Sequence, residues 1–167
     1  MRNLVSLALI IVAVHALADD SSKTVLASDE KTEIVVPNSW SPLDLNDAAE
    51  IQVGNEAEDA YLIVLNEAKD DLFAWNLERH SRVTLGQLLM NVANPTVIGP
   101  TALTIAGSPA VQYEIRGAAE NRNLVYIHTT VDGPKHFSQI IAWTVPSKAD
   151  RALPQLRRTI LTFRELP

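Results

Sequence analysis

The segment TTVDGPKHFSQIIAWTVP, residues 129–146, decides the fold because it joins two strand patterns through one tight turn. Asp132-Gly-Pro-Lys135 has turn chemistry, since glycine and proline interrupt regular backbone most strongly. Residues 137–145 are largely apolar, and residues 124–131 alternate between apolar and polar, so both stretches predict strands. Strands joined by so short a turn must pair antiparallel, which indicates an antiparallel sheet.

Other parts of the chain have similar strand patterns. They are rich in β-branched residues or alternate with period two, and they end at glycine, proline or asparagine. These predicted strands are residues 32–36, 50–54, 60–65, 97–106 and 111–116. The strands at 50–54 and 60–65 are expected to form a hairpin across the polar residues 55–59.

Two stretches have the period of a helix. In residues 75–92 the apolar side chains recur at i, i+3, i+4 and i+7, at Leu85, Leu88, Leu89 and Val92. A second apolar face at the end of the chain comprises Leu153, Leu156, Ile160 and Phe163. Ser147 and Asp150 resemble a capping box before this helix, and Pro154 is expected to delay its start.

This order of seven predicted strands and two helices indicates the fold class. Strands come in runs separated by helices, which is typical of α+β proteins and not of a doubly wound parallel sheet. We therefore predict a three-layer α/β/α arrangement, with a mainly antiparallel sheet of about seven strands and one main helix on each face.

The first residues have the layout of a secretory signal. Arg2 precedes an apolar run at residues 4–14, and Ala16-Leu17-Ala18 fits a cleavage site before Asp19. That run is 11 residues long, whereas a spanning helix needs roughly 18 or more. We predict a signal peptide at 1–18, a flexible leader at 19–30 and a single domain at 31–167, with periplasmic or secreted localisation and no transmembrane segment after cleavage.

Composition narrows the possible partners. The formal net charge is -6, and no basic patch is evident in the sequence, which argues against nucleic acid as a partner. The chain has no cysteine, so no disulfide can form and burial must stabilise the fold. A bacterial lipid anchor also requires a cysteine at the cleavage site, so we expect no lipid anchor.

Several of these features together resemble the PsbP-like fold, and the likeness extends to DcrB-like exported bacterial proteins. The features are Val36-Pro37 followed by Trp40, the helix with Leu85 to Val92, the step Gly107-Ser-Pro-Ala110, the hairpin with Tyr126 and His128, the strand at 137–144, and the terminal Leu161-Thr-Phe-Arg164. The resemblance covers about residues 33–166. It implies a three-layer fold and non-catalytic accessory or assembly roles, with an envelope protein as partner and no cofactor.

Histidines offer only weak metal-binding patterns. His128 and His136 flank the turn with Asp132 between them, but their spacing is not that of a dedicated zinc site. We therefore predict no metal site.

Polar residues on the last strands define a candidate binding site. If Val111 and Tyr113 share a sheet face with Val125 and Ile127, the other face carries Glu114 with His128. The candidate binding residues on this face are Glu114, Arg116, Tyr126, His128 and Gln139. Such a row could line a binding groove, or it could be the wet side of a half-buried sheet.

Tryptophans provide a second kind of candidate. Trp143 lies in a predicted strand and is expected in the core, while Trp40 and Trp75 could be core or interface. Trp75 is the better interface candidate because Asp70, Asp71, Glu78 and Arg79 surround it in the sequence.

The sequence contains no specific catalytic motif. It has no G-x-S-x-G elbow, and its six glycines are isolated and form no phosphate loop. We therefore predict an exported binding protein and not an enzyme. The alternative is a small-ligand carrier or enzyme that uses a polar sheet face around Glu114 and His128.

Overall fold

The computed structural model describes residues 21–167, so the predicted signal peptide at 1–18 lies outside the described residues. Within the described part the order is β1 (Ser22–Leu26), β2 (Thr32–Pro37), β3 (Ser41–Pro42), β4 (Ile51–Asn55), β5 (Ala60–Ala68), α1 (Leu77–Leu89), β6 (Ala93–Ile105), β7 (Ser108–Ala119), β8 (Arg122–Asp132), β9 (His136–Thr144), α2 (Ala149–Ile160) and β10 (Arg164–Glu165). Short 3-10 turns at Glu56–Glu58, Lys69–Asp71 and Pro146–Lys148 connect some of them.

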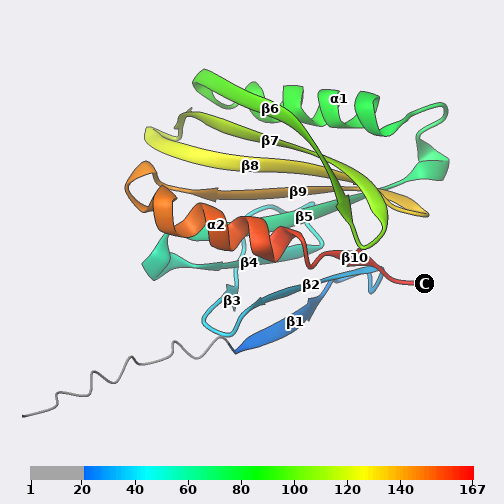
Figure 1. Cartoon of the computed structure of the whole chain (residues 1–167), viewed down its shortest axis with the longest axis horizontal. Coiled ribbons are helices and arrows are strands. Elements are labelled where there is room, and N and C mark those ends of the chain that lie inside the picture. The colour runs from blue at the N-terminus through cyan, green and yellow to red at the C-terminus, as the bar shows by residue number, and fades with distance from the viewer. Residues whose placement is uncertain (1–20) are drawn as a thin grey trace, which may run out of the picture.

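The main sheet has seven strands in the order β3-β4-β5-β9-β8-β7-β6, and every pair is antiparallel (Figure 1). This confirms the predicted α+β class, with one helix on each face of the sheet. One member differs from the prediction. The strand expected at residues 32–36 belongs to a separate three-stranded sheet, β1-β2-β10, and the two-residue β3 occupies the edge of the main sheet instead.

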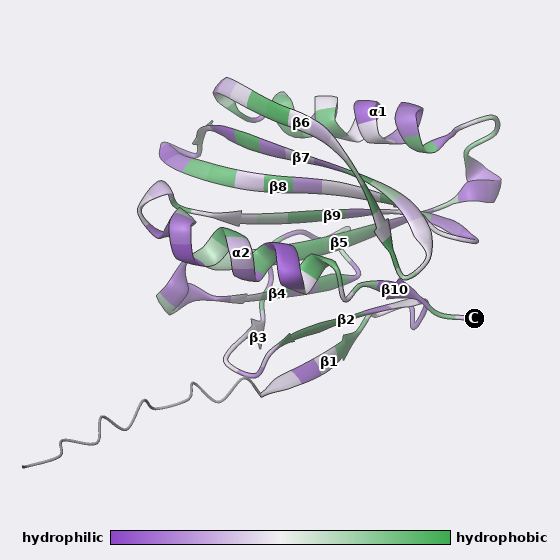
Figure 2. Ribbon diagram, in the orientation of Figure 1, coloured by the Kyte–Doolittle hydropathy of each residue, from purple (hydrophilic) through white to green (hydrophobic). Residues whose placement is uncertain are grey.

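One face of the main sheet, here called the α2 face, is covered over its central strands. Helix α2 crosses its middle, and the small sheet continues the cover beside the helix, over β4 and β5 (Figure 1). Strand β2 contributes to this cover because its residues alternate: Thr32, Ile34 and Val36 point inward and are buried, and the residues between them are half-buried. Figure 2 shows the apolar colouring of the strands beneath α2.

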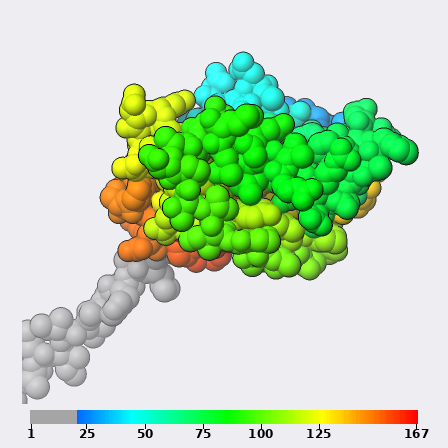
Figure 3. All heavy atoms as spheres, turned by 90° about the horizontal axis from the view of Figure 1, so that it is seen from above, coloured from blue at the N-terminus to red at the C-terminus, as the bar shows by residue number. Residues whose placement is uncertain are grey.

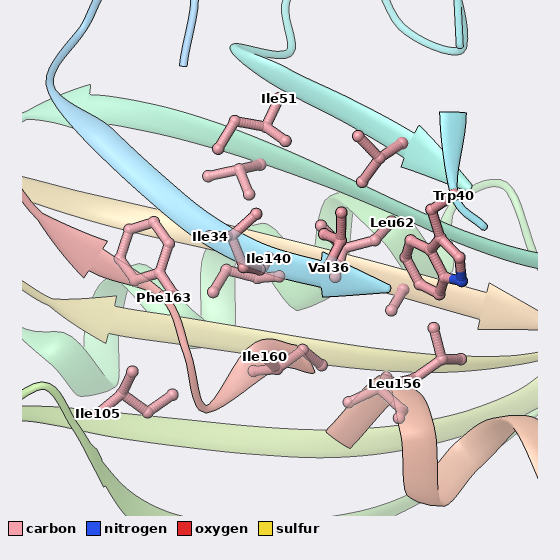
Figure 4. Packing of buried hydrophobic residues seen from close by; sticks show 14 of the residues in the cluster. Ile34, Val36, Trp40, Ile51, Leu62, Ile105, Ile140, Leu156, Ile160 and Phe163 are labelled. Atoms are coloured by element: carbon pink, nitrogen blue, oxygen red, sulfur yellow. The ribbon is translucent and has the colours of Figure 1, made fainter. Parts of the chain in front are cut away.

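The main core therefore lies between the α2 face and its cover. Trp40, Leu156 and Ile160 are fully buried in this layer, together with Phe163 (Figure 4). Segments from both ends of the described chain meet here, since Ile34 of β2 belongs to the same cluster as α2. Without a disulfide, burial of apolar side chains in this layer is what holds these distant segments together.

The flexible leader predicted at 19–30 is wrong from Ser22 onward. Ser22–Leu26 forms β1, which pairs with β2 from Ser22 opposite Pro37 to Leu26 opposite Glu33. Val25 packs against the main core and Ala27 is buried within it. Alternation of polar and apolar residues in SKTVL was the signal for this strand, and the polar composition around it masked the pattern.

Helix α2 also departs from the prediction at its start. It begins at Ala149, Pro154 lies inside it, and Lys148 is the N-cap without a side-chain hydrogen bond. Ser147 cannot cap because it lies within the 3-10 turn Pro146–Lys148. A proline inside a helix costs about 3 kcal/mol. Burial of several apolar side chains outweighs this cost, since each large one contributes about 1.5–3 kcal/mol.

Helix α1 is shorter than the predicted span of residues 75–92. It runs over Leu77–Leu89, and the side chain of Asn76 accepts a hydrogen bond from the Arg79 amide at 2.9 Å. Asparagine is among the best N-caps, so the helix begins after Asn76 and leaves Trp75 in the preceding loop. This boundary determines the geometry of the site described below.

Strand β6 forms one edge of the main sheet, and with α1 it makes up much of the surface seen from above (Figure 3). Its first ten residues are exposed, and they include Pro95 and Pro100. Its pairing with β7 is interrupted twice, between Ala93 and Thr96 and between Ile98 and Thr101. Prolines and bulges on an edge strand prevent further strands from pairing with it, so this edge is protected.

The end of the chain is fixed to the turn that precedes β9. The Glu165 carboxylate accepts a hydrogen bond from the Lys135 amide at 3.1 Å, and it lies 2.8 Å from Nδ1 of His136. His136 is buried in this contact, on the α2 face of β9. Its role is thus to hold β10 against the turn.

A pair of substitutions in α2 tests the core. Leu156→Ala should lower the free energy of unfolding by about 3 kcal/mol, because it leaves a cavity in the layer between the helix and the sheet. Leu161→Ala, one turn further and half exposed, should change it by less than about 1 kcal/mol. Urea denaturation measures both, and equal losses would contradict the assignment of this layer as the main core.

Candidate functional site

A surface depression of about 440 Å³ lies between the end of β5 and the start of α1. Two of its walls come from the loop between these elements, and its floor comes from the sheet. The lining residues are Lys69, Asp70, Leu72–Asn76, Asp132 and Phe137. The depression thus combines three aromatic rings with charged groups at its margin.

Phe73 projects from the loop into solvent with 92% of its surface exposed. The next residue, Ala74, has φ of 59°, a left-handed conformation that is unfavourable for a residue with a Cβ. Hydrogen bonds nevertheless close the loop tightly, because the Trp75 amide donates to the Leu72 carbonyl at 3.1 Å. The exposed ring is therefore presented on a short, hydrogen-bonded turn.

Trp75 occupies the opposite wall and is half-buried. The guanidinium of Arg79 lies 4.8 Å from its ring, which is a favourable cation–π distance. The His80 ring meets Trp75 edge-on, with 5.9 Å between ring centroids. Trp75 is consequently held in place, and part of its surface lines the depression.

The floor is formed by Phe137, which is almost fully buried. The Lys69 ammonium lies 4.9 Å from the Phe137 ring and 2.5 Å from a carboxylate oxygen of Asp132. Both charges of this pair remain partly exposed, so their mutual attraction is screened by solvent. A partner at this site would meet an apolar floor beside an ion pair.

Behind Phe137 a layer of polar side chains lies between α1 and the sheet. His80 stacks on Phe137 with 4.7 Å between centroids, and it is fully buried. Four other buried side chains belong to this layer. Ser81 and Thr84 come from α1, and His128 and Gln139 come from the sheet. Helix α1 therefore rests on the sheet through polar groups in its first half and through leucines in its second half.

Hydrogen bonds within this layer are incomplete. Nε2 of His128 lies 3.1 Å from Oγ1 of Thr84 and 3.0 Å from the amide nitrogen of Gln139. With that amide as donor, Nε2 carries the lone pair and the proton sits on Nδ1. Buried atoms in the described residues that lack a protein partner include Nδ1 of His128, Nδ1 of His80 and the Ser81 hydroxyl. Such atoms weaken the docking of the helix, since an unsatisfied buried polar group costs roughly 1–3 kcal/mol.

Burial controls the charge of both histidines. Loss of solvent is the main reason why the pKa of His128 is lowered to about 4, and repulsion by the nearby His80 adds to this shift. Burial also lowers the pKa of His80, although the Glu67 carboxylate, 3.5 Å from its Nε2, opposes the shift. Both rings are thus neutral in the folded protein at neutral pH.

The sequence-based candidates do not form one polar face. Tyr113 lies opposite His128, and Glu114 lies opposite Ile127, so the assumed register is wrong by one residue. A slip of one residue moves a side chain to the other face of the sheet. Tyr126, His128 and Gln139 therefore lie on the face under α1, here called the α1 face. Glu114 and Arg116 lie on the α2 face.

Glu114 and Arg116 have structural partners instead. The Glu114 carboxylate lies 2.8 Å from Arg116 and 2.8 Å from Arg157 of α2, which also bonds to Gln112. This network joins the edge of α2 to β7. The alternative of one ligand or catalytic site around Glu114 and His128 is thus wrong, because the sheet separates the two residues and α1 covers His128.

The three tryptophans differ in how deeply they are buried, and one of them differs from the prediction. Trp40 is fully buried in the main core, whereas Trp143 is only half-buried, although it was expected in the core. Trp75 lines the depression, as an interface residue would. Phe73, the most exposed large apolar residue of the described chain, was missed by sequence reasoning. The available signal was an aromatic residue within a charged loop just before a helix N-cap.

Residues 21–167 contain no cluster of three or more histidine, cysteine or acidic side chains arranged to hold a metal ion. Over the same range, none of the helices has both the length and the apolar character that crossing a membrane requires.

No family model and no curated protein sequence matches this chain. Solved structures do match it in fold. Cyanobacterial PsbP (CyanoP) from Synechocystis sp. PCC 6803 gives a TM-score of 0.65 at 12% identity, over 93% of this chain and 99% of that one. LpqN of Mycobacterium tuberculosis, involved in cell envelope biogenesis, gives 0.63 at 13%, over 88% and 91%. The Ran-binding protein Mog1p of Saccharomyces cerevisiae gives 0.61 at 13%, over 86% and 95%.

These likenesses establish the PsbP-like fold that the sequence features suggested. Identities of 12–13% carry information about fold alone, so they assign no activity to this chain.

Acid should destabilise the protein through the buried histidines. A folded-state pKa of about 4, against an ordinary value of 6.5, means that the unfolded chain binds the proton first. The contribution of His128 is complete above pH 6.5 and is lost as the pH falls toward 4, and it amounts to about 3 kcal/mol at about 1.4 kcal/mol per pKa unit. Urea denaturation at several pH values measures this slope.

The matched variant for this prediction is His128→Gln, whose amide keeps a polar group near the Thr84 hydroxyl but does not titrate. Its unfolding free energy should depend less on pH between 6.5 and 4 than that of the unchanged protein. Identical slopes in the two proteins would show that His128 is not the titrating group.

Proposed function

We propose that this chain is an exported accessory or assembly protein that acts by binding a protein partner in the cell envelope, without covalent chemistry. Export rests on the signal-like residues 1–18, and a periplasmic or secreted location follows from it. In character the chain is nearest to DcrB-like exported proteins. The observation that carries the binding role is Phe73, fully presented to solvent beside an aromatic depression.

Exposure of Phe73 is costly for a protein without a partner. Burying a phenylalanine side chain contributes about 1.5–3 kcal/mol, and the folded chain forgoes this although a turn holds the loop in place. Aromatic residues next to a pocket are typical of the few residues that dominate binding energy at interfaces. The depression offers the complementary feature, because its volume of about 440 Å³ leaves room for a side chain next to Trp75 and Phe137.

The edges of the main sheet are poorly suited to bind a partner. The β6 edge carries two prolines and two pairing interruptions, and the other edge ends in the two-residue β3. Neither edge offers a long row of free backbone groups to a partner strand. Recognition by β-strand addition is therefore disfavoured, and the loop with Phe73 remains.

Proteins with the same fold support a binding role for the scaffold. Mog1p is described as Ran-binding, and LpqN as involved in cell envelope biogenesis. Such roles suit a packed scaffold, because loops held by rigid elements often carry binding residues. Neither description identifies a partner for this chain, so the partner has to be inferred from the chain's own surface.

The proposal predicts that Phe73→Ser abolishes partner capture without unfolding the protein. Affinity-tagged protein incubated with envelope extract should enrich a partner, and the variant should recover it at least about tenfold less well. Its unfolding free energy should change by less than about 0.5 kcal/mol, because the side chain is exposed.

Leu161→Ser is the control, since it removes a half-exposed apolar side chain at the far end of α2. This control should capture the partner normally. Absence of any enriched protein, or equal capture by Phe73→Ser, would contradict the proposed function.

A further inference from the structure

The side chains of the two central strands, β5 and β9, are buried to different degrees on the two faces of the sheet. On the α2 face their apolar side chains are completely buried, at Leu62, Val64, Ile140 and Ala142. On the α1 face of the same strands, the apolar side chains at Tyr61, Leu65, Ile141 and Trp143 are only half-buried. One side of the sheet is therefore closed, and the other keeps apolar surface in contact with solvent.

The position of α1 explains this difference. Helix α1 packs over β7, β8 and β9, so β5 lies beyond it. On the far side of β5, the loop at residues 43–50 is fixed to β4, because Gln52 Oε1 accepts hydrogen bonds from the amides of Leu45 and Asn46. We call the half-buried apolar surface between α1 and this loop the β5–β9 strip. Its members are Tyr61, Leu65, Ile141 and Trp143, and Ile63 lies buried between them.

The strip is rigid and contains a stacked aromatic pair. Tyr61 lies opposite Trp143, with 5.4 Å between ring centroids and 18° between ring planes. Gly54 makes room for this arrangement, since a Cβ there would lie 2.9 Å from Leu43 Cδ1 and 3.1 Å from Tyr61 Cδ1. A preformed surface of this kind loses little conformational entropy when it binds.

At its other end the strip reaches the depression. Along β5 the α1-face residues continue from Tyr61 through Leu65 to Glu67, which lies opposite Phe137 in the floor of the depression. Six residue steps of a strand span about 20 Å. A helix of about 13 residues has the same length, at about 1.5 Å rise per residue.

The rim of the strip is acidic. Asp44 and Asp47 are exposed on the flanking loop. Beside Tyr61 lie Asp59 and Glu56, which add to the effect of burial in raising the pKa of that phenol. Arg122 is a nearby cation, and it lies 3.1 Å from Asp59. The surface therefore favours a partner with positive charge around an apolar stripe.

We propose that the β5–β9 strip binds an amphipathic basic helix of a partner protein, with its apolar stripe on the strip and its lysine or arginine side chains toward the acidic rim. This inference rests on the proposed binding function and specifies the chemistry of the partner. The helix would extend from Tyr61 toward Phe73, so the depression would take a side chain at its end.

Other occupants fit the surface less well. A partner strand cannot pair here, because β5 and β9 are interior strands whose backbone groups already bond to neighbours, whereas a helix satisfies its own backbone. An anionic membrane would be repelled by the acidic rim. A second copy of this acidic chain would be repelled in the same way, since the formal net charge is -6.

The test uses a synthetic peptide as probe. A 14-residue peptide, about the length given above, carries leucine at i, i+3, i+4 and i+7 and lysine on its other side, and its binding to the full mature chain is measured by fluorescence anisotropy. The same sequence with glutamate in place of lysine, and a scrambled version, are the comparison peptides. Only the lysine peptide should bind, with an affinity that falls as salt is added, and it should shift the indole NH resonance of Trp143.

Two double variants test the rim at equal net charge. Asp44→Lys with Asp47→Lys should weaken binding about tenfold, since it reverses the charge beside the strip. Glu30→Lys with Asp150→Lys makes the same change in net charge on exposed residues elsewhere, and it should bind like the unchanged protein. All four substituted residues are exposed, so folding should be preserved in both variants.

The outcomes separate this inference from the proposed function. No binding of the lysine peptide, equal weakening by both double variants, or an unchanged Trp143 indole resonance overturns the inference. If envelope-partner capture then still depends on Phe73, the proposed function stands without a helix on the strip. If the rim variant and Phe73→Ser both lose the captured partner, and the Trp143 indole shifts with the peptide, both are supported.

Discussion

The pairing register of β7, β8 and β9 is the constraint on which the rest of the structure depends. Tyr113 opposite His128, and His128 opposite Ile141, assign each residue of these strands to one face. Because side chains alternate along a strand, this register places Ile127 and Ile140 toward α2 and His128 toward α1. A change of one residue would move His128 to the α2 face, away from Thr84 and Gln139, and would move Ile127 out of the apolar core, so burial enforces the register that is observed.

The two faces of the sheet consequently differ in chemistry. Helix α2 and the β1-β2-β10 sheet close one face with fully buried apolar side chains, and Trp40 lies at their junction. On the other face α1 rests on a layer of buried hydroxyls, amides and imidazoles, and only Val92, Ile115 and Tyr126 are buried apolar residues in its cluster. A helix that packs through polar side chains with missing hydrogen bonds is stabilised less than a helix that buries the same area of apolar surface. The α2 side therefore supplies most of the stability, and the α1 side carries the surface features that suit binding.

Binding features arise where α1 begins. Asn76 caps the helix, so the chain must leave β5 and turn within a few residues, which leaves Phe73 in solvent and Trp75 against Arg79. The charged residues around Trp75 in the sequence were sufficient to predict it as an interface candidate. Phe73 and the half-buried β5–β9 strip could not be predicted in the same way. Their exposure depends on how far α1 extends across the sheet, and local sequence patterns carry no information about that.

The sequence by itself determined the α+β class, the order of the long strands and helices after residue 31, and the turn at residues 132–135, because periodicity, glycine and proline act over a few neighbouring residues. The two-residue strands β3 and β10 were not predicted. Tertiary structure decided that β2 joins a second sheet, that residues 22–26 pair with it, and that α2 tolerates Pro154. It also decided that Glu114 and His128 lie on opposite faces. Each of these results depends on contacts between segments distant in the chain, where the free energy of burial exceeds local preference by several kcal/mol in order of magnitude.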